Sequence, residues 1–593
     1  MSLKYQYYPI LDQTTIRLLE LQAGVLEEPL ICHMALASLD CNPSYEALSY
    51  CWGDATQKVD LLCDEKNISI TVNLSNALRR LRKPDGVRVL WADAACINQE
   101  DLEERGQQVK LMGSIYRKAS TTFVWLGHDD ERHAEAAFEL CMEIANGKVT
   151  RSLQGEPGQE RRFSIEEFPE YCEEKFSHLP PLFQCPWFSR MWVIQEVGLS
   201  KRVVLTWGDA EILWIHFIMV PLLLDGVSSL PDVFSGIFKP LQMKYLFGPA
   251  LNEGFLEALY RAQLFLATDP RDKIFGLLAH PTACVGPEGQ LAVEPNYTKS
   301  WQQVYLEFAN NWIEHRNNLE ILSAVRHHLG GRFMDDSFPS WVPCWDAPGG
   351  GMLGLFEADY KASGMVPHNI LPGNKLETLL RVRGLRFGIV REHSGPLLKT
   401  DLDYSEQELN IWLTISRGIK ESFYEAPAIS PYKQGSDHMD AYILSLSANM
   451  HQSNLSRSKL DQHLADFQAW WTAIRNQCID LEQASEICLD MPAVYEDRAL
   501  RGQSPSWAFH FNFGCLNRSF FRLDNGYVGV GQDVLEDGDI CCVLFGAKVP
   551  FIIRPCGSYF RLVGECYVHG IMNGEAMEMW KRNEILQEGF ELR

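Results

Sequence analysis

The segment from Leu90 to Gly127 limits the fold more than any other part of the chain, because it predicts two strands joined by one helix. Residues 87–92 and 121–126 are short apolar runs rich in β-branched and aromatic side chains, which is typical of buried strands. Between them, apolar residues recur at helical spacing and would form one buried face, made by Val109, Met112 and Tyr116. Two buried strands connected by a helix predict a right-handed parallel βαβ unit, and therefore an α/β fold.

Polar side chains directly follow the first of these strands, at the strand end where open parallel sheets bind their ligands. The candidate ligand-binding residues there are Asp93, Cys96, Asn98 and Gln99. Asp93 is placed to bind a ribose hydroxyl, and the alternative is that Asp93 and Asn98 cap the helix that follows. Cys96 has no histidine nearby in the sequence to activate it, which favours a small buried thiol over a nucleophile.

A neighbouring strand supplies a second set of candidates. Residues 45–50 predict a strand that ends at a turn, and residues 68–82 predict a strand followed by an amphipathic helix. Strands and helices thus alternate from residue 45 to residue 127, which is the pattern of an α/β domain. The candidate ligand-binding residues at this strand end are Ser49, Tyr50, Trp52 and Asp54, with packing on the core as the alternative for Trp52.

With 593 residues, the chain is too long for one hydrophobic core. Its pattern predicts an N-terminal extension over 1–42, an α/β domain over 43–200, a mainly helical region over 201–395, a helical region without clear motifs over 396–500, and a β-rich module over 501–593. The β-rich module is predicted from short apolar runs at 526–530, 540–545, 549–554 and 559–568. Residues 212–224 predict a buried helix that is too short to span a bilayer.

The net charge and the cysteine content limit the partners, the cellular compartment and the metal sites that we expect for this chain. The 77 acidic and 54 basic residues give a net charge of −23, and a field of that sign repels phosphate backbones and argues against nucleic acid as a partner. Seventeen cysteines, without a secretory signal at the N-terminus, predict reduced thiols and a cytoplasmic protein. Because no cysteine or histidine spacing is typical of a zinc site, we expect neither a metal nor a required cofactor.

A third dense block, from Trp187 to Val197, follows Pro186, which favours a helix start. This block, WFSRMWVIQEV, stands in order after YEALSYCWGD at 45–54 and LWADAACINQED…VWLG at 90–127. Together the three blocks resemble the fungal heterokaryon-incompatibility (HET) domain. Similarity to the flanking regions of stand-alone members continues in residues 267–279, 338–345 and 538–576, so that the resemblance covers most of the chain.

The resemblance implies a fold, a function and a catalytic residue. Members of this family trigger growth arrest or death when incompatible fungal cells fuse, and their parallel-sheet fold has been likened to the Toll/interleukin receptor (TIR) domain. Some TIR domains cleave NAD at its glycosidic bond with one glutamate on a helix, in a Trp-Cys-x-x-Glu pattern. Glu196 lies four residues after Trp192, so the resemblance implies Glu196 as the catalyst, Trp192 as a ligand-binding residue and NAD as a candidate substrate. The alternative for Glu196 is a structural acid that caps a helix or pairs with Arg190 or another base.

Two further classes of function stay open. Ala92 and Ala95 stand where the family commonly has bulky aliphatic residues, and Cys344 stands where it often has Asp. The alanines would enlarge a pocket at the strand end, unless a larger neighbour compensates. A recruited enzyme of fungal secondary metabolism would use such a pocket to direct a cyclisation, for example a pericyclic reaction of an apolar small-molecule ligand. The remaining class is a non-catalytic binding module with a protein partner or a second copy of the chain.

A few conspicuous residues are predicted to be structural. Arg105 and Gln108, on the predicted helix, are expected to make structural hydrogen bonds, and His569 to be an interior histidine of the β-rich module. The motif at 267–279 predicts a helix-start network with Pro270 in the first turn, formed by Asp269, Arg271 and Asp272.

Overall fold

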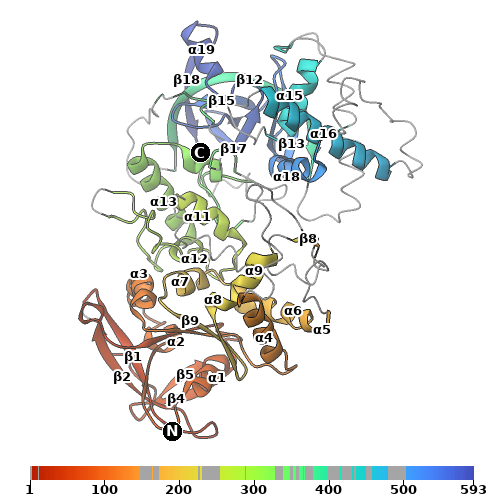
Figure 1. Cartoon of the computed structure of the whole chain (residues 1–593). Helices are drawn as coiled ribbons and strands as arrows, with labels where there is room; N and C mark the ends of the chain where they lie inside the picture. The colour runs from red at the N-terminus through yellow and green to blue at the C-terminus, as the bar shows by residue number, and fades with distance from the viewer. Residues whose placement is uncertain are drawn as a thin grey trace. The chain divides into compact units, whose positions relative to one another are not determined.

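The structure, a computed structural model, divides the chain into two compact units, Met1–Trp301 and Gln302–Arg593 (Figure 1). It describes residues 3–10, 12–146, 163–164, 173–224, 227–229, 254–286, 289–327, 338–347, 352–355, 360–364, 366, 378–398, 415, 430–432, 436–448, 457–478 and 502–593. The larger sheets lie one in each unit, so the units are described separately.

The first unit is built on a nine-stranded sheet with the order β10-β9-β7-β3-β6-β1-β2-β4-β5. Its strands are β1 (Thr15–Leu21), β2 (Ile31–Ser38), β3 (Glu46–Tyr50), β4 (Lys58–Cys63), β5 (Lys66–Thr71), β6 (Arg88–Trp91), β7 (Thr122–Trp125), β9 (Val203–Trp207) and β10 (Ala210–Leu213). β3 is parallel to both of its neighbours, β6 and β7, and β7 is parallel to β9. The carboxyl ends of these strands therefore meet at one edge of the sheet.

The predicted parallel strands and their connecting helix are confirmed, with one difference in topology. The helix α3 (Leu102–Lys118) connects β6 to β7, and Val109, Met112 and Tyr116 are buried on it. However, β3 lies between the two strands, so they are not neighbours. The expectation of a parallel sheet is also too simple, because β1 pairs antiparallel with β2 and β6, and β10 pairs antiparallel with β9. The sheet is mixed.

The residues expected to form an N-terminal extension, 1–42, supply two strands to this sheet. β1 is hydrogen-bonded to β2 on one side and to β6 on the other, which places it inside the sheet. Its sequence TIRLLEL does not alternate between polar and apolar residues, and nearly all of it is buried, as in strands covered on both faces.

Helices and a small second sheet complete the first unit. They are α1 (Val72–Leu81), α2 (Asp93–Cys96), α4 (Ala134–Ala145), α5 (Glu173–Phe176), α6 (Leu179–Phe183), η4 (Pro186–Ser189), α7 (Val193–Gly198), α8 (Trp214–Phe217), α9 (Met219–Leu224), α11 (Phe255–Arg261), η6 (Ala262–Leu264) and α12 (Asp272–Phe275), with strands β8 (Phe163–Ser164) and β11 (Val227–Ser229). Asp101 caps α3 by accepting hydrogen bonds from the backbone N–H groups of Glu103 and Glu104. The alternative cap formed by Asp93 and Asn98 is wrong, because residues 93–96 form a separate helical turn.

Two predicted helices are interrupted. The segment from Pro186 does not form one helix, because Arg190 is extended between η4 and α7. Residues 212–224 begin in β10 and continue as the short helices α8 and α9 instead of one buried helix. β9 and β10 also fall in the region predicted to be mainly helical, which contains the helices α11 and α12 and, in the second unit, α13 (Trp301–Arg316), with described non-helical residues between α12 and α13.

The second unit contains the predicted β-rich module as a sheet that closes on itself. Its strands are β12 (Leu380–Pro396), β13 (Arg518–Leu523), β14 (Val528–Gln532), β15 (Ile540–Leu544), β16 (Phe551–Cys556), β17 (Tyr559–Val568) and β18 (Gln587–Leu592). β12 pairs with β15 and β18 through its first part and with β13 through its last residues. This closure leaves few free strand edges around a core that includes Phe521, Val543 and Ile552.

The four predicted runs of this module correspond to β14, β15, β16 and β17, whereas β12 is a strand where the sequence predicted helix. The helices of the second unit are α13 (Trp301–Arg316), η7 (Glu320–Ala324), α15 (Ser436–Leu446), α16 (Arg457–Cys478), α18 (Ser504–Cys515) and α19 (Glu575–Lys581). α15 and α16 lie within 396–500; most other residues of that range are outside the described residues. Among the described helices, none combines the length and hydropathy that crossing a membrane requires.

Candidate functional site

Glu196 lies on α7 and reaches the carboxyl end of β3. The Ser49 hydroxyl, at the penultimate position of β3, donates a hydrogen bond to Glu196 Oε2. The Trp187 indole N–H in turn donates to Ser49 Oγ at 2.8 Å. Glu196 is 2% exposed and Ser49 is 1% exposed, so this chain of hydrogen bonds is shielded from solvent. The strand end and the helix together fix the carboxyl group in one position.

Burial and charge act on this carboxyl group in opposite directions. Removal from solvent raises the pKa of Glu196 to about 7, although Arg190 and the hydrogen bond from Ser49 both lower it. Arg190 Nη1 lies 3.9 Å from Glu196 Oε2, and the guanidinium also donates to the Tyr50 carbonyl oxygen. The predicted pairing of Glu196 with Arg190 is therefore present. A pKa near 7 allows the carboxyl group to hold or release a proton at neutral pH.

Trp52 and Asp93 form the outer part of the same strand-end region. The indole N–H of Trp52 donates to Asp93 Oδ2 at 2.9 Å, and Trp52 is 37% exposed. Tyr50 is buried, and burial together with the charge of Asp93 raises the pKa of its hydroxyl well above its ordinary value. Asp93 also raises the pKa of Glu196 slightly, which places both carboxyl groups within electrostatic range of each other. Five of the predicted residues thus come together: Ser49, Tyr50, Trp52, Asp93 and Glu196.

Asp54 and Trp192, two predicted ligand-binding residues, make hydrogen bonds to other parts of the protein. Asp54 is exposed in the turn after β3, where its carboxylate accepts two hydrogen bonds from Thr56. The Trp192 indole N–H donates to Asp272 Oδ2 at 3.1 Å, so its polar atom is turned toward α12 and not toward Ser49.

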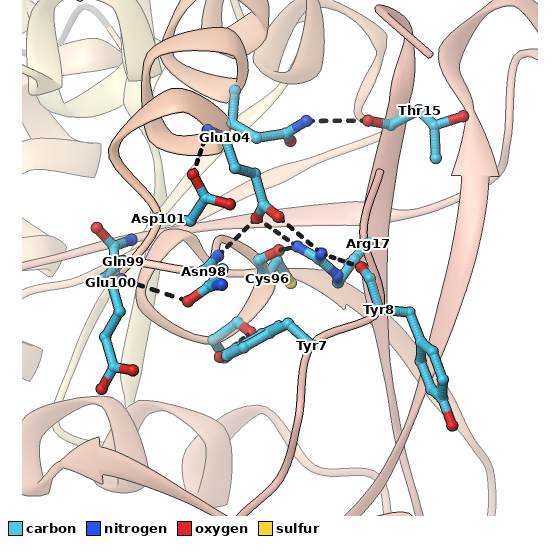
Figure 2. A network of polar contacts seen from close by, with 12 residues as sticks. Tyr7, Tyr8, Thr15, Arg17, Cys96, Asn98, Gln99, Glu100, Asp101 and Glu104 are labelled. Atoms are coloured by element: carbon cyan, nitrogen blue, oxygen red, sulfur yellow. Dashed lines mark hydrogen bonds and ion pairs between the residues drawn. The ribbon is translucent and has the colours of Figure 1, made fainter. Parts of the chain in front are cut away.

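The polar segment after α2 is held by a buried ion pair that the sequence analysis missed (Figure 2). The Arg17 guanidinium, on β1, makes two contacts to the carboxylate of Glu104, at 2.5 and 2.9 Å. Arg17 also donates to the Cys96 carbonyl oxygen, and Glu104 accepts from the Asn98 backbone N–H at 2.7 Å. The available signal was an arginine inside an apolar strand, because a buried charge requires a partner.

This network gives Cys96, Asn98 and Gln99 structural contacts. Cys96 is fully buried, and burial raises the pKa of its thiol to about 12, which keeps it protonated at neutral pH. The Gln99 side-chain amide donates to the Asp93 carbonyl oxygen at 3.0 Å. Both Ala92 and Ala95 are fully buried, and the Tyr7 hydroxyl donates to the Ala95 carbonyl oxygen at 3.0 Å. Larger neighbours therefore cover the two small side chains.

The remaining predicted structural residues also have defined contacts. Gln108 donates to the Thr15 carbonyl oxygen at 3.0 Å, and Asp269 accepts from the Arg271 backbone at 3.1 Å just before α12. The helix-start network is thus present, although α12 begins two residues after Pro270. Burial lowers the pKa of His569 to about 4, as expected for a packed neutral histidine. Within the part of the chain that the structure describes, no three His, Cys, Asp or Glu side chains are grouped to hold a metal ion.

The chain is similar to fungal incompatibility proteins along most of its length. A family model described as "Heterokaryon incompatibility protein (HET)" matches residues 45–196, and one described as "Het-6 beta-barrel domain" matches residues 511–586. The Neurospora crassa protein "Heterokaryon incompatibility protein 6, OR allele" is 26% identical over 682 aligned positions that cover 96% of each chain. No solved structure gave a significant match. The first match begins just before β3 and ends at Glu196, so it spans the strand end and the helix of the candidate site.

Proposed function

We propose that this chain, which has a HET domain and a Het-6 β-barrel domain and is a distant homologue of the Neurospora protein over nearly its whole length, is an effector of the incompatibility response whose action depends on Glu196. The observation that carries the proposal is the position of the Glu196 carboxyl group. It is fixed at the carboxyl end of β3 by Ser49, with Arg190 beside it, and its pKa is about 7. Ligands of open α/β sheets bind at this edge.

The proposed reaction is hydrolysis of the N-glycosidic bond of NAD. The bond between ribose C1′ and the nicotinamide nitrogen breaks, and its electron pair leaves with neutral nicotinamide. The Glu196 carboxylate would stabilise the positive charge that develops on the ribose, as the carboxylates of glycosidases do. Water then adds to C1′ and loses a proton, which gives ADP-ribose. A carboxyl group with a pKa of about 7 is suited to accept that proton.

The outer residues of the site suit the other parts of a dinucleotide. The half-exposed ring of Trp52 offers a surface on which a base can stack. The Asp93 carboxylate is placed to accept a hydrogen bond from a ribose hydroxyl, and the Arg190 guanidinium to contact the pyrophosphate. The substrate class is therefore a nicotinamide dinucleotide, and NAD is the first candidate to test.

The test compares Glu196→Gln with a matched surface variant, Glu135→Gln on α4, where the glutamate is exposed. Purified full-length proteins are incubated with NAD, and nicotinamide release is followed by chromatography. Expression of the same variants in a fungal host is scored for growth arrest. We expect the wild type and Glu135→Gln to release nicotinamide and arrest growth, and Glu196→Gln to do neither.

Other outcomes decide between the alternatives. Growth arrest by both variants, without loss of NAD, would overturn the role of Glu196 and leave an effector that acts by binding. A recruited cyclase would show neither effect and requires a deep apolar cavity beside Ala92 and Ala95. Because both alanines are fully buried beneath neighbouring residues, no observation favours that alternative.

A further inference from the structure

The motif at 267–279 contacts the helix that carries Glu196. This motif has no part in the proposed reaction. α7 has only six residues, and a helix of that length does not keep its position without tertiary contacts. Segment 266–276 contacts α7 and the residues before it at three points. All of these residues belong to the first unit.

The first contact is a backbone pairing just before α7. The Leu266 backbone N–H donates to the Ser189 carbonyl oxygen at 2.5 Å, and the Met191 backbone N–H donates to the Leu266 carbonyl oxygen at 2.8 Å. These two bonds make a parallel bridge between Arg190 and Leu266. The extended residue that separates η4 from α7 is thereby fixed on segment 266–276.

The second contact joins Asp272 to Trp192, the residue before α7. Asp272 Oδ2 accepts from the Trp192 indole N–H at 3.1 Å, and Asp272 Oδ1 accepts from the Tyr297 hydroxyl at 2.7 Å. Asp272 is buried, and burial raises the pKa of its carboxyl group to about 6. The Arg105 guanidinium lies over the Tyr297 ring, 3.8 Å from its centroid, and supplies the nearby positive charge. The hydrogen bonds from Trp192 and Tyr297 therefore fix the position of the Asp272 carboxyl group.

The third contact holds the middle of α7. The Gln195 side-chain amide donates to the Phe275 carbonyl oxygen at 3.3 Å. The residue that follows α12 also packs closely against the residues before α7: a Cβ on Gly276 would lie 2.9 Å from Met191 Cγ. A larger residue at position 276 would therefore displace the Met191 side chain.

Trp192 connects these contacts to Glu196 directly, because the Glu196 backbone N–H donates to the Trp192 carbonyl oxygen at 3.2 Å. We propose that Asp272 is a positioning residue that acts through Trp192 to hold α7 in a closed arrangement, in which Glu196 is inaccessible to substrate. The expected effect on activity rests on the proposed function, because the closed arrangement would lower the rate of NAD cleavage. Glu196 is 2% exposed in this arrangement, so its carboxyl group must be uncovered before a substrate can reach it, and α7, which carries Glu196, is the element that would move.

The test uses Asp272→Leu and Trp192→Phe, which remove the acceptor and the donor of the same hydrogen bond. Asp272→Asn is the conservative control, because its carbonyl oxygen still accepts from Trp192. Hydrogen exchange of the full-length protein measures the opening of residues 193–198. We expect exchange there to be roughly 5- to 10-fold faster in Asp272→Leu and in Trp192→Phe, as for the loss of one hydrogen bond. Asp272→Asn should remain close to the wild type.

Unchanged exchange at 193–198, or an equal increase over the whole first unit, would overturn the inference. Nicotinamide release is then measured for the same variants and for Asp272→Leu combined with Glu196→Gln. We expect Asp272→Leu to release nicotinamide faster than the wild type, and the double variant to release none. Another contrary outcome is that exchange rises at 193–198 while the rate of nicotinamide release stays the same or falls. In that case Asp272 positions α7 but does not limit nicotinamide release, and the inference fails. If no variant releases nicotinamide, the proposed function fails, whereas the exchange result still decides whether Asp272 positions α7.

Discussion

The hydroxyl of Ser49 donates a hydrogen bond to the carboxyl group of Glu196, across 147 positions of sequence. Ser49 is the penultimate residue of a central parallel strand, and Glu196 lies on a short helix that follows the extended residue Arg190. The carboxyl group lies 3.9 Å from the Arg190 guanidinium, is within electrostatic range of Asp93, and is almost completely removed from solvent. The predictions below concern this carboxyl group and its partner Ser49, the buried ion pair between Arg17 and Glu104, and the exposed ring of Trp52.

Replacement of Glu196 with glutamine should change stability in a pH-dependent way. Burial raises the pKa of Glu196 from 4.5 to about 7, so the folded protein binds more protons than the unfolded chain between these values. The contribution of this group to stability therefore falls as the pH rises from 4.5 to 7, by roughly 3 kcal/mol. We expect Glu196→Gln to raise the melting temperature at pH 8 and to have little effect at pH 4.5. Calorimetry of both proteins at the two pH values tests this; an equal shift at both would contradict it.

Replacement of Ser49 with alanine should destabilise the first unit. The variant leaves the buried Trp187 indole N–H without its acceptor and removes the hydrogen bond from Ser49 to the Glu196 carboxyl group, which costs about 1–3 kcal/mol. Ser189→Ala is the matched control, because the side chain of that half-buried serine makes a local hydrogen bond to the Pro186 carbonyl oxygen. We expect the control to change the free energy of unfolding by less than about 0.5 kcal/mol. Urea unfolding that shows equal effects for both variants would refute the importance of the Ser49 bonds.

The ion pair between Arg17 and Glu104 should contribute far more than an exposed pair. Removal of one partner leaves a buried charge without compensation, so we expect Arg17→Met to cost about 3–5 kcal/mol. Lys4→Met is the control: Lys4 pairs with Glu100 at 2.8 Å, but their side chains are 77% and 80% exposed, and such pairs contribute at most about 1 kcal/mol.

A double variant separates charge from packing at this ion pair. Arg17→Met combined with Glu104→Leu should cost less than the sum of the two single variants, because no unpaired charge remains. Urea unfolding of the four proteins of this cycle measures the coupling. Additive effects would show that Arg17 and Glu104 act independently.

Trp52 should matter for activity and hardly at all for stability. Trp52 is 37% exposed and has one side-chain bond, to Asp93. If a dinucleotide base stacks on this ring, Trp52→Ala should raise the KM for NAD by roughly 5-fold or more, since stacking contributes about 1–3 kcal/mol per base. Val59→Ala, at a residue that is 38% exposed on β4, is the control for loss of exposed apolar surface. Equal KM values for Trp52→Ala and the control would exclude stacking on Trp52.

Local sequence patterns predicted a large part of the fold. The apolar runs of β6 and β7, the buried face of α3 and the strands β14–β17 follow from spacing over a few residues, because each side chain's direction is set by the local backbone. The same reasoning missed β1 as an interior strand, β3 as the neighbour of both β6 and β7, and β12 as a strand. The errors at β1 and β3 have one cause: strand pairing joins segments that are distant in sequence, and no local spacing encodes the partner.

The residue types at the candidate site were visible in the chain, and their grouping at the carboxyl ends of parallel strands followed from the α/β pattern. The environments of these residues could not be predicted from the sequence. Asp93 and Glu196 are both carboxylic acids near strand ends, but Asp93 is half-buried beside an exposed Trp52, whereas Glu196 is enclosed behind Ser49 and Trp187. Sequence supplies the ionisable groups, whereas the folded chain sets their solvation and their partners. Because a pKa depends on these two quantities, only the assembled sheet and α7 give Glu196 its raised pKa.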